Sequence, residues 1–169
     1  MVADGLREAL ETILPDWLVV TLLAFMPIVE VRASIPVGYL VYRMGAVQTV
    51  LWSLLGCLLI LPVAFAILPV LERLGRKWSR LGTMMDWLFA RARKQSKKAQ
   101  VAGHAGLFAI VALPLPGAGT WTACIAAYVL GMPVRKALPT ILLGILVEIA
   151  IVGVVVFTGA KAWEWLLSA

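Results

Sequence analysis

The residues of this sequence best suited to chemistry are three ionisable side chains inside apolar runs: Glu30, Arg32 and Glu148. An ionised side chain at the centre of a bilayer costs about 2.5–3.5 kcal/mol even on mild insertion scales, so each must be paired, neutralised or used. Residues two apart point to different sides of a helix but share one side of an extended segment. Glu30 and Arg32 could therefore form a structural ion pair, or point together at a ligand, if the chain is unwound there.

Glu148 is the second candidate, because it lies twelve residues into the apolar run 137–160, too deep for a short side chain to reach water. Such a carboxyl group is expected to be protonated, paired with Arg32 or exposed to a polar cavity. A plain counter-charge for Arg32 is as good an interpretation as a role in transport. If all three groups are ionised, the interior carries one net negative charge, and an anionic substrate would need a proton to enter with it.

The elements that must hold these residues are mostly apolar. Of the 169 residues, 62% are hydrophobic and 14% are charged, against about 45–50% and 25% in soluble domains. Four apolar blocks are each long enough to cross a hydrocarbon core of about 30 Å, at 17–42, 46–71, 105–130 and 137–160. The chain is therefore predicted to be an all-α, multi-pass integral membrane protein with a single membrane domain.

The first and third blocks contain residues that interrupt helices. The expected hairpin-shaping residues are Pro27, Pro36 and Gly38 in the first block, and Pro114, Pro116 and Gly117 in the third. Arms such as 17–26 and 37–44 reach only about 15 Å and 12 Å, half a bilayer, which favours re-entrant helical hairpins. Backbone amides freed at the second tip, together with the Thr120 hydroxyl, could bind an anion, although close packing of small residues explains the glycines almost as well.

The spacing of proline and glycine suggests an internal repeat. Pro27 is followed by Gly45 and Gly56 at distances of 18 and 29 residues, and Pro114 by Gly131 and Gly144 at distances of 17 and 30. One hairpin and one full transmembrane helix in each half, at 17–71 and 105–160, would insert in opposite directions. This arrangement is an inverted repeat, in which substrates bind near the midplane.

Basic residues predict the orientation. Nine of the fifteen Lys and Arg residues lie in 72–100, which is therefore expected to be cytoplasmic, and the hairpins also place Arg135 and Lys136 inside. Apolar residues within the basic segment 72–104 recur at helical spacing and predict an amphipathic interfacial helix over 72–93, with a solvated linker as the alternative. Residues 1–16 form an N-terminal amphipathic segment without the pattern of a cleavable signal.

Other classes of function are disfavoured. The sequence holds no Ser/His/Asp, Cys/His or metal-ligand set at workable spacing, so neither an enzyme, a metal site nor a cofactor is expected. The basic charge follows membrane topology rather than a nucleic-acid footprint. The expected partners are membrane lipids, a substrate and a second copy of the chain, since a homodimer would shield the hairpins in the plasma membrane.

Two motifs resemble those of a known family. The segment from Glu30 to Gly38 resembles the E-x-R-x-x-I-P-x-G signature of the small multidrug export proteins, and 114–122 with 131–136 resembles their P-x-P-G-x-G-x-W-T and G-x-P-x-R-K elements. That family is similar to the wider DedA/VTT superfamily, whose members share two re-entrant hairpins within inverted repeats. The resemblance implies membrane transport, because members of the superfamily are implicated in moving phospholipid or polyprenyl-phosphate carriers across bilayers, with proton coupling proposed. DedA proteins carry arginines in the second hairpin, which this chain lacks, so the resemblance extends only to Glu30, Arg32 and Pro36, with the prolines and Gly117 of the second tip as shaping residues.

The leading functional hypothesis is a transporter or flippase of an anionic lipid carrier, in which Arg32 binds the head group and Glu30 or Glu148 exchanges a proton. One alternative is export of small amphipathic or cationic compounds, bound directly by the carboxylates. Another is a membrane scaffold that transports nothing.

The hairpin arrangement makes a prediction about topology. Both termini should face outside, while residues 72–100 and 131–136 should face the cytoplasm. Labelling of single cysteines with an impermeant reagent measures this directly. Label that reaches residue 135 from outside would favour four full spans instead.

Overall fold

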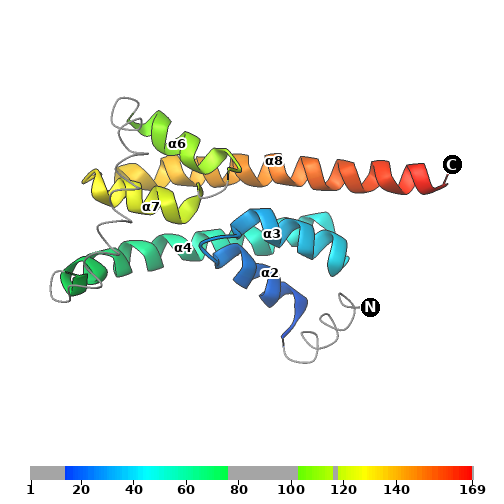
Figure 1. Cartoon of the computed structure of the whole chain (residues 1–169), viewed down its shortest axis with the longest axis horizontal. Helices are drawn as coiled ribbons and strands as arrows, with labels where there is room; N and C mark the ends of the chain where they lie inside the picture. The colour runs from blue at the N-terminus through cyan, green and yellow to red at the C-terminus, as the bar shows by residue number, and fades with distance from the viewer. Residues whose placement is uncertain (1–13, 76–102, 116–117, 169) are drawn as a thin grey trace. The chain divides into compact units, whose positions relative to one another are not determined.

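The computed structural model describes residues 14–75, 103–115 and 118–168, and all regular structure in these residues is helical (Figure 1). The elements are α2 (Asp16–Phe25), α3 (Glu30–Pro36), the π-helix η1 (Val37–Val41), α4 (Ala46–Gly75), α6 (His104–Ala112), α7 (Thr120–Val129) and α8 (Val134–Ser168). The all-α prediction is confirmed for this part of the chain. The predicted interfacial helix lies outside the described residues beyond Gly75, as does most of the N-terminal segment.

The helices α4 and α8 are long and apolar enough to cross a membrane. The stretches that qualify are Ala46–Arg73, with 28 residues, and Val134–Ala160, with 27 residues. At about 1.5 Å per residue both exceed a hydrocarbon core of about 30 Å. Large apolar side chains remain exposed along them, including Val47, Leu51, Leu143, Val154 and Val155. Both stretches coincide with the two blocks for which full spans were predicted.

Prolines interrupt the hydrogen-bond ladders of these long helices. Helix α4 contains Pro62 and Pro69, and α8 contains Pro139. Each proline lacks the amide hydrogen of a normal rung. Membrane helices tolerate such residues because neighbouring groups and small local adjustments satisfy the freed carbonyls.

The chain divides into two compact units. One joins Met1–Cys57 with Ile149–Ala169, and the other is Leu58–Glu148. Both long helices pass from one unit into the other, so each unit contains part of α4 and part of α8. The short helices α2 and α3 belong to the first unit, and α6 and α7 to the second.

In the first unit, α2 contacts α3 and packs closely on α4. A Cβ atom added at Gly56 would lie 2.4 Å from the carbonyl oxygen of Thr21 and 2.6 Å from the Cβ of Ala24. The rings of Trp17 and Trp52 lie 4.8 Å apart between centroids. Only glycine permits an approach this close, which is typical of helix packing in membranes.

The second unit repeats this arrangement with α6 and α7 beside the first part of α8 (Figure 1). A Cβ atom added at Gly144 would lie 2.5 Å from the Cβ of Val111 and 3.4 Å from the carbonyl oxygen of Phe108. Near the start of α6, His104 Nδ1 lies 3.0 Å from Thr140 Oγ1.

The contacts of the two units correspond residue by residue. Phe108 and Val111 follow Thr21 and Ala24 at an offset of 87 residues, and the two glycines are offset by 88. The same offsets relate two further pairs in contact. His104 corresponds to Trp17 at an offset of 87, and Thr140 corresponds to Trp52 at an offset of 88. These matching contacts are those expected of an internal repeat.

The first break in the chain is shorter than predicted. Helix α2 ends at Phe25 and α3 begins at Glu30. The second arm of the hairpin was predicted to begin at residue 37, so the observed helix begins seven residues earlier than predicted. Pro36 lies inside α3, and the chain widens directly after it into η1, where the Tyr42 amide donates to the Val37 carbonyl at 3.0 Å. The π-helical turn thus follows the proline, and the helix continues through Pro36 to Val41. Pro36 and Gly38 therefore reshape the helix without ending it.

The second break matches the prediction for 113–120. Helix α6 ends at Ala112 and α7 begins at Thr120. Two short turns lie between them: the Leu115 amide donates to the Leu113 carbonyl at 2.7 Å, and the Ala118 amide to the Leu115 carbonyl at 3.0 Å. Pro116 and Gly117 fall outside the described residues.

The glycine contacts predict a clear stability difference. Gly56→Ala and Gly144→Ala should each destabilise the protein by about 1–3 kcal/mol, because the new methyl group meets backbone or Cβ atoms that cannot move aside easily. Gly159→Ala in α8 is the matched control, since nothing lies within 4 Å of its added Cβ. It should be neutral or stabilising by up to about 1 kcal/mol through helix propensity. Thermal unfolding of the purified protein in detergent measures all three, and equal melting temperatures would contradict the close packing.

Candidate functional site

Helix α3 presents its two ionisable residues to different surroundings. Its buried residues are Glu30, Val31, Ser34 and Ile35, which form one face, whereas Arg32 lies off this face and is half-buried. Glu30, Val31 and Arg32 are helical, so the extended segment that would have aligned Glu30 with Arg32 is not formed. In a helix, residues two apart point to different sides. Part of the Arg32 residue is thus exposed, although its Nε atom is buried, and Glu30 lies within the protein.

Glu30 has an unusual backbone as well as a buried side chain. Only 3% of its surface is exposed, and its φ angle is +44°. A residue other than glycine is uncommon in this left-handed region, and such conformations cluster at functional sites. The residue directly follows the turn that contains Pro27, and its amide donates to the Met26 carbonyl at 3.3 Å. The turn therefore directs a carboxyl group into the interior at a local conformational cost.

A buried hydrogen bond holds α3 on α4. Ser34 Oγ donates to Ser53 Oγ at 2.8 Å, and both residues are fully buried. Further along, a Cβ atom added at Gly38 would lie 2.7 Å from Thr49 Cγ2, so η1 also touches α4 closely. These two contacts fix the rotation of α3 and hence the direction in which Glu30 points.

The interior of the first unit is more polar than the sequence analysis indicated. Its buried polar side chains are Thr21, Glu30, Ser34, Thr49 and Ser53. Thr49 and Ser53 were not recognised, although hydroxyl residues four apart and followed by Gly56 on an apolar helix are a typical packing face. Hydroxyl groups serve packing by themselves. With a buried carboxyl group among them, they also give the unit the means to hold a proton or a polar group.

The second unit buries one carboxyl group and one hydroxyl group among its described residues. Glu148 is the fifteenth residue of α8 and is fully buried within the protein. Thr120 is also fully buried, at the first position of α7 after Gly119, whose φ angle is +143°. Pro114 is half-buried in the turn before it. Glu148, Thr120 and Pro114 thus share the second unit, whereas Glu30 and Arg32 belong to the first with Pro27, Pro36 and Gly38.

A hydrogen bond between α7 and α4 was not foreseen. The Tyr128 hydroxyl donates to the carboxylate of Glu72, one of the two acidic residues of the basic segment 72–100. The sequence gives no signal for this pair, because the two residues are 56 positions apart. The bond ties the end of one long helix to the second short-helix pair.

Metal ligation has no support within the described residues. No group of three or more His, Cys, Asp or Glu side chains lies close enough together there to hold a metal ion. Cys57 and Cys124 are both buried and reduced.

Comparison with known proteins gives one family. The family described as "Putative small multi-drug export protein" matches residues 30–151, which begin at Glu30 and include Glu148. No curated protein and no solved structure matches the chain. Since the match covers well over half of the sequence, the chain belongs to the small multi-drug export protein family.

Proposed function

We propose that this protein is a proton-coupled transporter that moves an amphiphile with an anionic head group, of the polyprenyl-phosphate or phospholipid type, across the plasma membrane. Membership in an export family supports transport over catalysis. The observation that carries the proposed substrate class is the arrangement of charge on α3. Arg32 is half-buried, with its Nε atom enclosed, whereas the whole Glu30 residue is buried.

Arginine suits this role because its planar guanidinium group binds phosphate oxygens through two parallel hydrogen bonds and is more weakly hydrated than an ammonium group. In the proposal, Arg32 holds the head group while the apolar tail remains in lipid. The hydroxyl residues beneath α3 provide polar surroundings for the part of the head group that leaves water.

Proton coupling follows from the count of charges. The described spans and hairpins bury two carboxyl groups, Glu30 and Glu148, against the single half-buried guanidinium of Arg32. An entering anion would add uncompensated charge in a medium where each charge already costs kilocalories. Protonation of one carboxyl group removes that obstacle. Glu148 is the proposed proton carrier, because it is fully buried on a helix that is long and apolar enough to span the membrane.

The proposed architecture uses short helices as half-spans. Helices α2 and α7 have ten residues each, which corresponds to about 15 Å or half a hydrocarbon core. We infer that the pairs α2–α3 and α6–α7 are re-entrant hairpins in an inverted repeat, and that a second copy of the chain shields them.

Export of small amphipathic or cationic compounds is the second candidate. The description of the family favours it, and a buried carboxyl group such as Glu30 is the natural partner of a cationic substrate. Arg32 would then act as a counter-charge. A scaffold without transport activity is the remaining outcome of the experiments below.

The two transport hypotheses differ in the effect of removing one charge. In proteoliposomes, Arg32→Ala should abolish movement of polyprenyl phosphate or phospholipid, and Glu30→Gln should also impair it, while both variants assemble normally. Arg73→Gln, at the exposed end of α4, is the matched control and should retain activity. A cationic dye serves as the second substrate. Transport of the dye alone, lost in Glu30→Gln and retained in Arg32→Ala, would establish the second candidate, and no transport of any substrate would favour the scaffold.

The proton carrier can be tested by the pH dependence of transport. Transport of an anionic substrate should accelerate when the loading side is acidified, because protonation compensates the entering charge. Glu148→Gln mimics the protonated form permanently, so it should lose this pH response while still binding substrate. Asp16→Asn, which removes a carboxylate at the start of α2, should keep the response. An unchanged pH profile in Glu148→Gln would remove Glu148 from the mechanism.

A further inference from the structure

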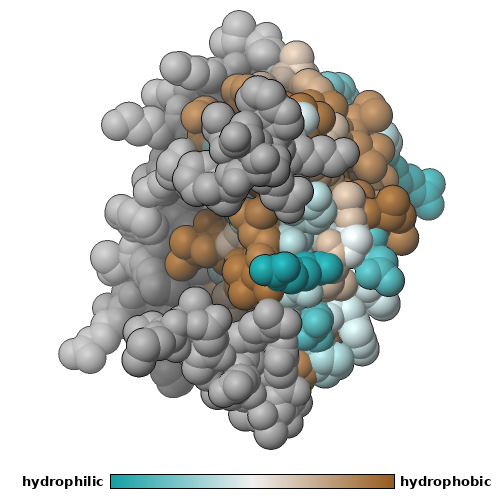
Figure 2. Space-filling view, turned by 90° about the vertical axis from the view of Figure 1, so that its right-hand side faces the viewer, coloured by the Kyte–Doolittle hydropathy of each residue, from teal (hydrophilic) through white to brown (hydrophobic). Residues whose placement is uncertain are grey.

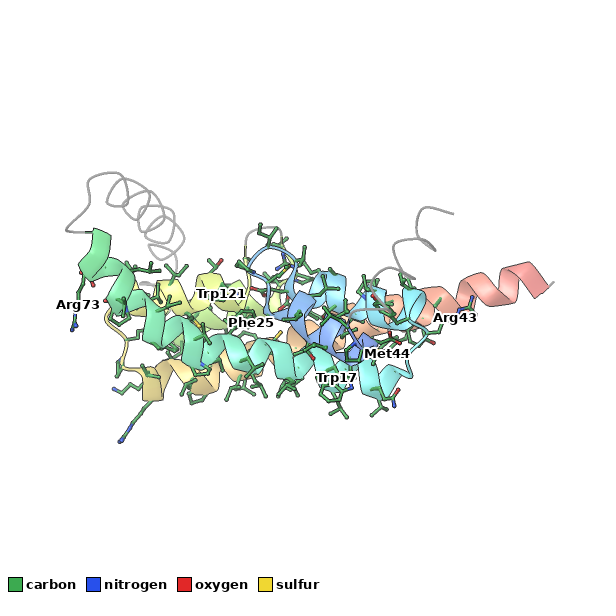
Figure 3. The ribbon with its side chains drawn as sticks, turned by 90° about the horizontal axis from the view of Figure 1, so that it is seen from below. Trp17, Phe25, Arg43, Met44, Arg73 and Trp121 are labelled. Carbon is green, nitrogen blue, oxygen red and sulfur yellow. The ribbon has the colours of Figure 1, made fainter. Side chains whose placement is uncertain are left out.

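The first unit contains a pocket that the proposed transport site does not use. It has a volume of about 320 Å³ and is lined by Tyr39, Leu40, Arg43, Met44 and Ala160. This volume lies within the range of about 300–1,000 Å³ that is typical of small-molecule sites. Figure 3 shows Arg43 and Met44 together where the chain turns from η1 into α4.

The lining of this pocket favours an anion. Arg43 is exposed and is the one charged residue among the five, none of which is acidic. Tyr39, which carries a hydroxyl group, lines the same pocket. An arginine with a neighbouring hydroxyl donor matches the oxygen atoms of a phosphate group.

Arg43 occupies a backbone conformation that favours glycine. Its φ angle is +52°, and it lies three residues before the start of α4. The residue at the corresponding position of the other repeat, three before α8, is Gly131, with a φ angle of +64°. An arginine therefore stands where glycine adopts the same turn without strain, and the backbone alone gives no reason for that side chain.

The second unit shows what the pocket lacks. There the Tyr128 hydroxyl donates to the Glu72 carboxylate. At the repeat offset of 88 residues, Leu40 takes the position of Tyr128 and Ala160 takes that of Glu72. The neighbouring Tyr39 packs edge-on against Phe157, with 4.7 Å between ring centroids. The first unit thus has a methyl group in place of the carboxylate, and a cation beside it.

Exposed apolar residues lie in the same stretch of sequence as the residues that line this cationic pocket. Leu40 is 53% exposed and Val47 is 73% exposed, and Val41 between them is exposed as well. Figure 2, which looks toward the end of the molecule where η1 meets α4, shows hydrophilic and hydrophobic surface side by side. A ligand that satisfies both surfaces has an anionic group and an apolar tail.

We propose that this pocket binds the phosphate group of an anionic membrane lipid, with the phosphate on Arg43 and Tyr39 and the acyl chains along Leu40, Val41 and Val47. This site is separate from Glu30 and Arg32. The proposal that this site binds a lipid does not depend on whether the protein transports such a lipid.

Lipid binding to the full-length protein in detergent, followed by native mass spectrometry, tests the proposal. Phosphatidylglycerol should bind at least about tenfold more tightly than zwitterionic phosphatidylcholine, a ratio expected from one charge-assisted contact. Arg43→Gly should lose this preference without loss of thermal stability, because glycine suits the left-handed turn. Arg135→Gln, which removes an exposed cation at the start of α8, is the matched control and should bind like the wild type.

A second variant and a competitor complete the test. Ala160→Glu retains Arg43 but introduces the carboxylate found in the other repeat, so it should also lose the preference. Inorganic phosphate should compete only weakly, since it lacks the tail; equal competition would identify a site for free anions and overturn the lipid assignment. Unchanged lipid binding in both variants would overturn the site itself. Arg32→Ala should still bind phosphatidylglycerol here, which separates a failure of this site from a failure of the proposed transport function.

Discussion

The close approach of helix backbones at Gly56 and Gly144 is the contact on which the rest of this structure depends. Lipid offers little hydrophobic force to press one apolar helix on another, so packing at short range must supply the association. At both glycines a short helix touches a long one so closely that even a methyl group would collide with its atoms. Because α2 and α6 are anchored in this way, the helices that follow them, α3 and α7, start at defined points beside α4 and α8.

Polar interactions then determine which way the anchored helices face. In the first unit the Ser34–Ser53 hydrogen bond sets the rotation of α3, which places Glu30 inside and leaves Arg32 half-buried. In the second unit the bond from Tyr128 to Glu72 ties α7 to α4. Neutral packing therefore fixes position, and hydrogen bonds fix orientation. The two units share the close glycine contact and differ in their hydrogen bonds.

Local signals determine how much of this arrangement could be predicted from the sequence. The two long helices and the break before Thr120 were predicted correctly, because an uninterrupted apolar run and a Pro-Leu-Pro-Gly stretch act on the chain directly. The first break was misplaced, since the helix continues through Pro36 into η1 and the break lies before Glu30. The roles of Ser53 and Tyr128 could not be predicted, because their hydrogen-bond partners are distant in sequence. Ser53 also resembles any other small residue of an apolar helix. The ionisable candidates Glu30, Arg32 and Glu148 were visible because charge is rare in such surroundings, whereas their separate environments were not.

The prolines of the long helices give these helices an uneven bending stiffness. Pro62, Pro69 and Pro139 all lie within Leu58–Glu148, whereas the parts of α4 and α8 that belong to the first unit contain no proline. Each missing rung lowers the resistance of a helix to bending at that point. We therefore expect the long helices to bend more easily within Leu58–Glu148 than in their remaining parts.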